Sequence, residues 1–200
     1  MPKQKITKEM VVNAAFELAR DGGMENVMVK NIANKLSCSV QPVYTYCNNM
    51  AGLQKEVVEK ANDFVQKYIS ANIDKRNLFQ STGQAYIKLA KEEPGIFKIF
   101  ILKQRENIAS LNDLYQSEAS PQTAGYIAEG LGISIEQAKQ LHINMLIYTI
   151  GIGTILSVTT PGIPAGEILS QQETAYNAFL KQVLDGTQET CCLAKFQKRT

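Results

Sequence analysis

Hydrophobic residues recur every three to four positions along most of the chain, and no segment of strand length alternates apolar and polar residues. Glycine and proline divide this pattern into separate segments. The pattern therefore predicts an all-α protein. The expected helices cover residues 7–20, 29–36, 39–46, 51–73, 78–91, 96–102, 107–131, 134–158 and 166–184, and Ser120-Pro121 would interrupt the seventh of them.

Capping residues mark several of the expected helix starts. Thr7 and Ser39 each precede an apolar-periodic segment, as an N-cap does, and Pro42 falls in a first turn, where its missing N–H costs little. Ser134 and Gln137 have the three-residue spacing of a capping box. These signals predict where the helices begin independently of their periodicity.

The first three helices are short, and a four-residue turn, Ser37 to Val40, joins the second to the third. This arrangement describes a helix-turn-helix, in which a small core holds the third helix outward and allows it to enter a major groove of DNA. The expected core comprises Leu18, Ile32, Ala33, Leu36 and Val43. The following helix would bury Leu53, Val57, Ala61, Phe64 and Tyr68.

The side chains that face outward on the third helix suit DNA chemistry. Gln41 can hydrogen-bond a base edge, and the methyl groups of Val40 and Thr45 can contact a thymine methyl. Tyr44 and Tyr46 either reach phosphate oxygens or cover the small core. Residues 1–50 hold six basic and four acidic side chains, so DNA contacts here must use hydroxyls, amides and backbone N–H groups as well as cations.

Residues 6–53 resemble the DNA-binding region of the TetR/AcrR family of transcriptional regulators. The residues that carry the resemblance are Ala14-Ala15, Leu18, Gly23, Ile32-Ala33, Leu36, Ser39, Val43-Tyr44, Tyr46 and Leu53. It implies that Val40, Gln41 and Thr45 face bases, that Tyr44 and Tyr46 touch phosphates, and that Lys30 reaches the DNA. The expected DNA-binding residues are Lys30, Ser39, Val40, Gln41, Pro42, Tyr44, Thr45, Tyr46 and Asn49.

Four features depart from the family pattern. Ser37 stands where the turn usually has glycine, so we expect a left-handed serine at a cost of about 1 kcal/mol. The second helix has Met28-Val29 at its start in place of a hydroxyl cap, Met50 replaces a phosphate-binding lysine, and Cys47 replaces a common phenylalanine. These changes predict fewer phosphate contacts and a shallower salt dependence of DNA binding.

The resemblance implies a DNA-binding domain over residues 1–50, a connecting helix over 51–73, and a ligand-binding and dimerisation domain over 75–186. Residues 187–200 would form a polar tail. The last two long helices have wide apolar faces that suit a four-helix interface between two copies. The expected dimer residues are Leu141, Ile152, Ile155, Ala175, Phe179 and Val183. Residues expected to line an apolar, aromatic effector pocket are Tyr86, Phe97, Phe100, Ile101, Tyr115, His142, Met145 and Tyr148, although aromatic residues at helical spacing are more often core.

Several other functions lack support in the sequence. We find no glycine-rich phosphate loop, no metal-type spacing of histidine and cysteine, and no nucleophile with a plausible base, so we expect neither an enzyme nor a bound cofactor or metal. The longest apolar stretch, residues 143–158, is too short to span a membrane. The first residues do not resemble a signal peptide, and we expect a cytoplasmic protein with reduced thiols.

The predicted function is therefore a ligand-responsive regulator that binds operator DNA as a homodimer, with repression favoured and activation left open. Two alternatives remain. Cys38 and Cys47 flank the third helix, so oxidation of either thiol could displace it in a redox-sensing regulator, although both could be small core residues. The second alternative is a helical dimer that binds small molecules but not DNA.

Overall fold

The computed structural model describes residues 6–46, 49–159 and 162–185 of the 200-residue chain, and within these ranges every regular element is a helix. The α-helices are α1 Lys8–Gly22, α2 Val29–Lys35, α3 Val40–Tyr46, α4 Met50–Asn72, α5 Leu78–Glu92, α6 Pro94–Ile101, α7 Leu111–Glu118, α8 Thr123–Leu131, α9 Ile135–Leu156 and α10 Ala165–Leu184. Two short 3₁₀ helices, η1 Met24–Asn26 and η2 Lys75–Asn77, join them. The predicted all-α fold class is confirmed.

The chain forms two compact units, and neither is a continuous stretch of sequence. Unit 1 comprises residues 1–106 and 149–167, and unit 2 comprises residues 107–148 and 168–200. These units divide the chain at other places than the predicted domain boundaries, because α1 packs against both α4 and α6 within unit 1. The functional division at residues 50 and 75 stays a prediction.

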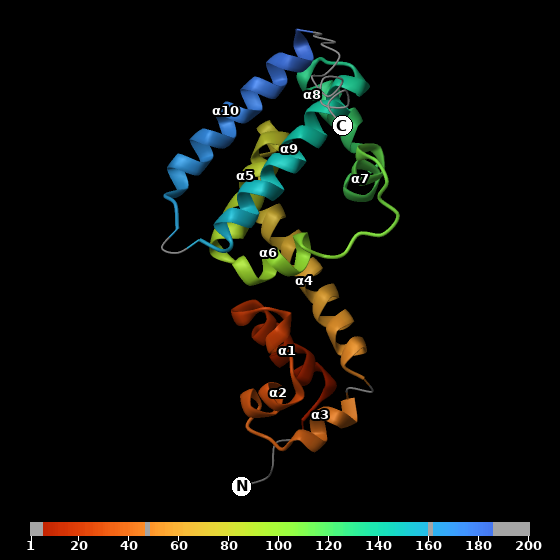
Figure 1. Ribbon diagram of the computed structural model, residues 1–200, viewed down its shortest axis with the longest axis vertical. Coiled ribbons are helices and arrows are strands. Elements are labelled where there is room, and N and C mark those ends of the chain that lie inside the picture. The colour runs from red at the N-terminus through yellow and green to blue at the C-terminus, as the bar shows by residue number, and fades with distance from the viewer. Residues whose placement is uncertain (1–5, 47–48, 160–161, 186–200) are drawn as a thin grey trace, which may run out of the picture. The chain divides into compact units, whose positions relative to one another are not determined.

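Local capping fixes the helix starts in unit 1. The Thr7 hydroxyl accepts a hydrogen bond from the Met10 N–H at 3.2 Å, as its sequence position predicts, and α1 ends at Gly23, whose φ is 89°. The Asn49 side chain accepts from the Gly52 N–H at 2.6 Å and so caps α4. Figure 1 shows α2 and α3 side by side next to α1, and these three helices contact one another.

The buried face of α4 differs in part from the predicted one. Leu53, Val57 and Ala61 are buried as expected, but Val65 and Ile69 continue this face in place of Phe64 and Tyr68. Phe64 and Tyr68 are half-buried on the neighbouring stripe, where their rings stack with centroids 6.2 Å apart. Aromatic rings one turn apart on a helix can pack against each other without facing the core. The hydrophobic period alone does not distinguish this arrangement from burial.

Unit 2 contains α7, α8 and most of α9 and α10. The predicted capping box begins α9: the Ser134 Oγ accepts from the Gln137 N–H at 3.2 Å, and the Gln137 Oε1 accepts from the Ser134 N–H at 3.0 Å. The Gln137 side-chain amide also donates to the Val183 carbonyl, which joins the start of α9 to the end of α10. These two helices therefore run antiparallel in unit 2.

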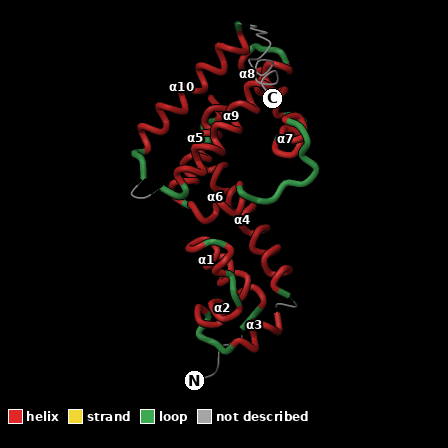
Figure 2. The backbone as a smooth tube through the Cα atoms, in the orientation of Figure 1, coloured by secondary structure: helices red, strands yellow, loops and turns green. Residues whose placement is uncertain are grey.

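The predicted helix over residues 107–131 is divided into α7 and α8, as Ser120-Pro121 indicated, but its expected start was wrong. Asn107 has a φ of 59°, and residues 102–110 form a loop, green in Figure 2. The Ser110 hydroxyl accepts from the Asp113 N–H at 3.1 Å and so caps α7, which begins at Leu111, four residues later than expected.

Candidate nucleic-acid interface

The turn between α2 and α3 has the hydrogen bonds of a Schellman motif. The Cys38 N–H donates to the Ala33 carbonyl at 3.0 Å, and the Ser37 N–H donates to the Asn34 carbonyl at 3.1 Å. Ser37 lies at the left-handed position of this motif with a φ of 51°, which confirms the expected conformation. The motif terminates α2, and α3 begins two residues after Cys38.

Helix α3 is held from one side and exposed on the other. Val43 is fully buried among the apolar residues of unit 1, where Ile32 and Ala33 of α2 are also buried. The expected core residues Leu18 and Leu36 are half-buried. One buried anchor in a seven-residue helix leaves the remaining positions available to solvent, as a recognition helix requires.

The side chains predicted to face bases are exposed. Val40, Gln41 and Thr45 all lie on the open side of α3. The Thr45 hydroxyl donates to the Gln41 carbonyl at 3.1 Å, which engages the hydroxyl within the helix. The Thr45 methyl group therefore remains the part of this side chain that suits a thymine methyl.

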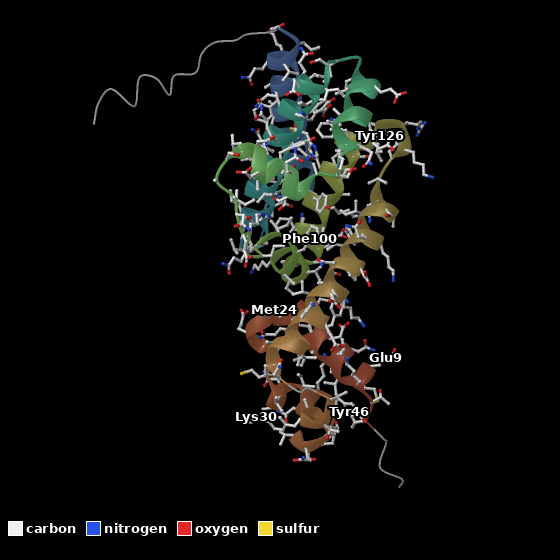
Figure 3. The ribbon with its side chains drawn as sticks, turned by 90° about the vertical axis from the view of Figure 1, so that its right-hand side faces the viewer. Glu9, Met24, Lys30, Tyr46, Phe100 and Tyr126 are labelled. Carbon is white, nitrogen blue, oxygen red and sulfur yellow. The ribbon has the colours of Figure 1, made fainter. Side chains whose placement is uncertain are left out.

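The two tyrosines of α3 differ in their surroundings. Tyr44 is 58% exposed, which favours the phosphate role over covering the core, and Tyr46 is half-buried. Figure 3 shows Lys30 and Tyr46 at the same end of unit 1, away from Phe100. Lys30 is exposed on α2 and has no acidic partner among the described residues.

The remaining predicted DNA-binding residues flank α3. Ser39 is exposed immediately before the helix, Pro42 is half-buried in its first turn, and Asn49 is exposed at the cap of α4. The Asn49 side-chain oxygen is used for that cap, so its amide N–H₂ is the group left to donate. The absent hydroxyl cap of α2 is confirmed, because Met28 precedes α2 without a side-chain capping bond.

A set of contacts that the sequence did not reveal joins α1 to α6 within unit 1. The Arg20 Nε donates to a Glu93 carboxylate oxygen at 2.7 Å, and the Arg20 Nη2 donates to the other oxygen. These hydrogen bonds raise the pKa of Arg20, and its guanidinium lies 5.4 Å from the centroid of the Phe64 ring. Because 73 residues separate Arg20 from Glu93, no local sequence signal indicates this pair.

Gly95 brings the two helices even closer at the same place. It is buried, and a Cβ added there would lie 2.1 Å from the Arg20 carbonyl oxygen. Only glycine permits this approach between the end of α1 and the start of α6. The end of α1 is thus fixed to α6 by backbone packing as well as by an ion pair.

The predicted pocket residues divide between the two units. In unit 1, Phe97 and Ile101 are buried, and the rings of Tyr86 and Phe100 stack with centroids 6.1 Å apart. Phe97 packs closely on Gly153 of α9, where an added Cβ would lie 2.4 Å from the ring. The predicted aromatic pocket residues of unit 1 therefore pack against other residues of that unit.

In unit 2, Tyr115 of α7 meets His142 of α9 edge-to-face, with ring centroids 5.3 Å apart. The Tyr115 hydroxyl lies 3.4 Å from the His142 Nδ1. Burial lowers the pKa of His142, so the imidazole is neutral at pH 7. Met145 is buried and Tyr148 is half-buried on the same helix.

The residues predicted for a dimer interface vary in exposure. Leu141 and Val183 are buried within the single chain, and Ile152, Ala175 and Phe179 are half-buried. Ile155 is exposed, and nothing lies within 4 Å of a Cβ added at Gly151, one turn before it. In unit 1 this face of α9 is therefore open.

The remaining predictions concern thiols, metal ligands and membrane-spanning helices. Cys38 is a half-buried free thiol in the turn before α3, whereas Cys47 and Cys191-Cys192 lie outside the described residues. The described residues contain no group of three potential metal ligands. In the same part of the chain, no helix combines the length and apolar character that crossing a membrane requires.

Comparison with known proteins supports the fold assignment. No family model matches the chain. A protein named as an uncharacterised helix-turn-helix-type transcriptional regulator, YobS of Bacillus subtilis, is 23% identical over 105 residues, which are 51% of this chain and 55% of that protein. The chain thus spans about half the length of this curated relative.

A solved structure resembles nearly the whole chain. It is a TetR-like transcriptional regulator from Rhodococcus sp. RHA1, with a TM-score of 0.61 and 12% sequence identity over 88% of this chain and 96% of that one. The resemblance inferred from residues 6–53 is therefore confirmed at the level of the fold. This chain has the all-helical fold of a TetR-like transcriptional regulator.

Proposed function

We propose that the chain is a transcriptional repressor that binds operator DNA as a homodimer and releases it when a small apolar or aromatic molecule binds. The observation that carries this proposal is the exposed face of α3, which Val43 anchors from behind. Gln41 and the methyl groups of Val40 and Thr45 would read base edges in the major groove. Tyr44, Tyr46, Lys30 and the Asn49 amide would contact phosphates.

We expect a homodimer because the proposed recognition helix, α3, is short. A single seven-residue helix contacts only a few base pairs, and paired half-sites about 34 Å apart restore specificity. The exposed Ile155 beside Gly151 supports a partner on α9, because an apolar side chain next to a glycine permits close helix packing. We expect the predicted interface residues on α10 to take part in dimerisation as well.

Release of DNA requires that the effector favours a form in which the two α3 helices no longer match the half-sites. The contacts of Arg20 with Glu93 and of Gly95 with the end of α1 support a route for this coupling. Since α1 also packs on α2 and α3, a shift of α6 would move the recognition helix with it. The effector is expected to be apolar or aromatic because the residues predicted to contact it are.

Selection from random duplexes, followed by fluorescence anisotropy on the selected sequence, tests the DNA-binding step. Gln41→Ala should weaken binding about 5- to 150-fold, which corresponds to the 1–3 kcal/mol of a base contact. Lys30→Met should reduce the slope of log K against log salt by about one, as expected for one lost phosphate contact. Tyr44→Ala should weaken binding to all sequences alike.

Matched controls exist on exposed positions elsewhere. Tyr126 of α8 is as exposed as Tyr44, and Lys67 of α4 is exposed like Lys30, so Tyr126→Ala and Lys67→Met should leave DNA affinity unchanged. Equal binding to selected and scrambled duplexes would contradict a sequence-specific regulator. No binding at low salt would favour the alternative of a helical dimer that binds small molecules only.

A further inference from the structure

Unit 1 contains an open cleft that none of the predicted site residues line. Its volume is about 490 Å³, within the range of small-molecule sites. The end of α1 and η1 form one wall, and α6 with the two residues after it forms the opposite wall. We call it the α1–α6 cleft, because the two helices that meet at Gly95 form its walls.

Apolar side chains from both walls and from α4 line part of the cleft. They are Met24, Val58, Ile99 and Leu102, of which Leu102 is 53% exposed. An exposed leucine beside three partly or fully covered apolar neighbours offers surface that a ligand could remove from water. The cleft can therefore hold an aliphatic or aromatic group.

The two walls carry opposite charges. Lys98 and Lys103 lie on the α6 wall, and Asp21 and Glu25 lie on the α1 wall. The carbonyl end of α1 adds partial negative charge to the second wall. Each wall thus presents one sign of charge next to the apolar residues.

These charges do not neutralise each other across the cleft. Lys98, Lys103 and Glu25 form no ion pair among the described residues, and Asp21 has only a 3.9 Å contact with Lys35, outside the cleft. Lys103 instead lies 5.4 Å from the centroid of the Phe100 ring. The cleft therefore retains a free cation and a free anion on opposite walls.

We propose that the α1–α6 cleft binds a small zwitterion with an apolar side chain, of the chemical class of an apolar α-amino acid. Lys98 and Lys103 bind the carboxylate, Glu25 and the carbonyl end of α1 bind the ammonium group, and Leu102 with Met24 covers the side chain. Because the ligand contacts both walls, its affinity depends on the position of α1 against α6, and its binding favours one such position. The resulting change in DNA affinity rests on the proposed function, whereas the binding itself does not.

Calorimetric titration of the full-length chain with L-phenylalanine tests the binding. Two analogues are matched controls, since 3-phenylpropanoate lacks the ammonium group and 2-phenylethylamine lacks the carboxylate. We expect saturable binding of phenylalanine, at least tenfold tighter than that of either analogue. No saturable binding up to the solubility limit would overturn the proposal, as would equal affinity for phenylalanine and 3-phenylpropanoate.

Substitutions in the cleft test whether phenylalanine binds there. Lys98→Met and Glu25→Gln should each weaken phenylalanine binding at least tenfold, and Glu25→Gln should also remove the preference over 3-phenylpropanoate. Lys67→Met, on an exposed position of α4 away from the cleft, should bind like the wild type. Melting temperatures within about two degrees of wild type would establish that the variants fold, and unchanged affinity in a folded Lys98→Met variant would overturn the site.

The regulatory consequence has a separate readout. Anisotropy on the selected duplex should show at least a threefold change in DNA affinity when phenylalanine saturates the protein, and Lys98→Met should abolish that change. Bound phenylalanine without any change in DNA affinity would overturn the regulatory part. If no duplex binds at all, the proposed function fails while the calorimetric result still decides the cleft.

Discussion

The contact between Gly95 and the end of α1 gives the sharpest prediction for stability. In Gly95→Ala, the new Cβ would lie 2.1 Å from the Arg20 carbonyl oxygen, 2.8 Å from the Arg20 carbonyl carbon and 3.0 Å from the Ala19 carbonyl oxygen. Backbone atoms cannot rotate away as a side chain can. An ordinary contact begins at 3.4 Å, so the two helices must separate by about 1.3 Å at this point.

The cost follows from what surrounds Gly95. Ile96 and Phe97 follow it in α6 and are fully buried, so the movement disturbs a close-packed region. Overpacking of this kind costs about 1–3 kcal/mol, and the helix preference of alanine over glycine returns about 0.5–1 kcal/mol. We expect the free energy of unfolding to fall by about 1 kcal/mol, which lowers the melting temperature by about 2–4 °C in a chain of this size.

Urea and thermal unfolding at one fixed protein concentration measure this change, since a dimer would make both concentration-dependent. Gly130→Ala in α8 is the matched control, because no atom lies within 4 Å of its added Cβ. It should be neutral or stabilise the chain by up to about 1 kcal/mol. A Gly95→Ala variant as stable as the Gly130→Ala variant would refute the close approach of α1 and α6.

Three further predictions concern single side chains. Ser37→Gly should raise the free energy of unfolding by about 1 kcal/mol in urea titrations, because glycine removes the left-handed strain; a loss of stability would contradict the Schellman assignment. Gln172 is buried and neither of its amide atoms has a partner among the described residues, so Gln172→Met should stabilise the chain by about 1–3 kcal/mol, and a lower melting temperature would show that the amide is satisfied. Burial lowers the pKa of His142, so below its ordinary value of 6.5 the unfolded chain takes up the proton first, and stability should fall as the pH drops. His142→Asn should flatten that decline in melting temperatures measured from pH 8 to 5, and an unchanged pH profile would exclude the histidine.

Features that depend on neighbours in sequence were predictable. Thr7 caps α1, Ser134 and Gln137 form the capping box of α9, and Ser37 takes the left-handed conformation. Each of these depends on backbone groups within about five residues, which the sequence displays directly. The helix-turn-helix was predictable for this reason, since its turn and its caps are local.

Features that depend on distant residues were missed. The apolar period of α4 is consistent with either Phe64 or Val65 facing inward, but Val65 is fully buried, whereas Phe64 is half-buried beside Arg20. Gly95 follows a proline in the sequence and looks like a simple helix break, but its role is set by the backbone of α1. Tertiary packing determines which face of α4 is buried and how closely Gly95 approaches α1. The hydrophobic period of the sequence contains no information about that packing.

Helix α1 contacts both α6 and α3, the proposed recognition helix, and this has a consequence for how a signal could travel. Helix α1 packs on α2, α3, α4 and α6, and four of its alanine and valine side chains are fully or almost fully buried. A helix that is closely packed against several neighbours resists bending. We therefore expect a movement of α6 to reach α3 through α1, so that a ligand that contacts α6 alone would change the proposed DNA affinity without touching the proposed DNA-binding residues.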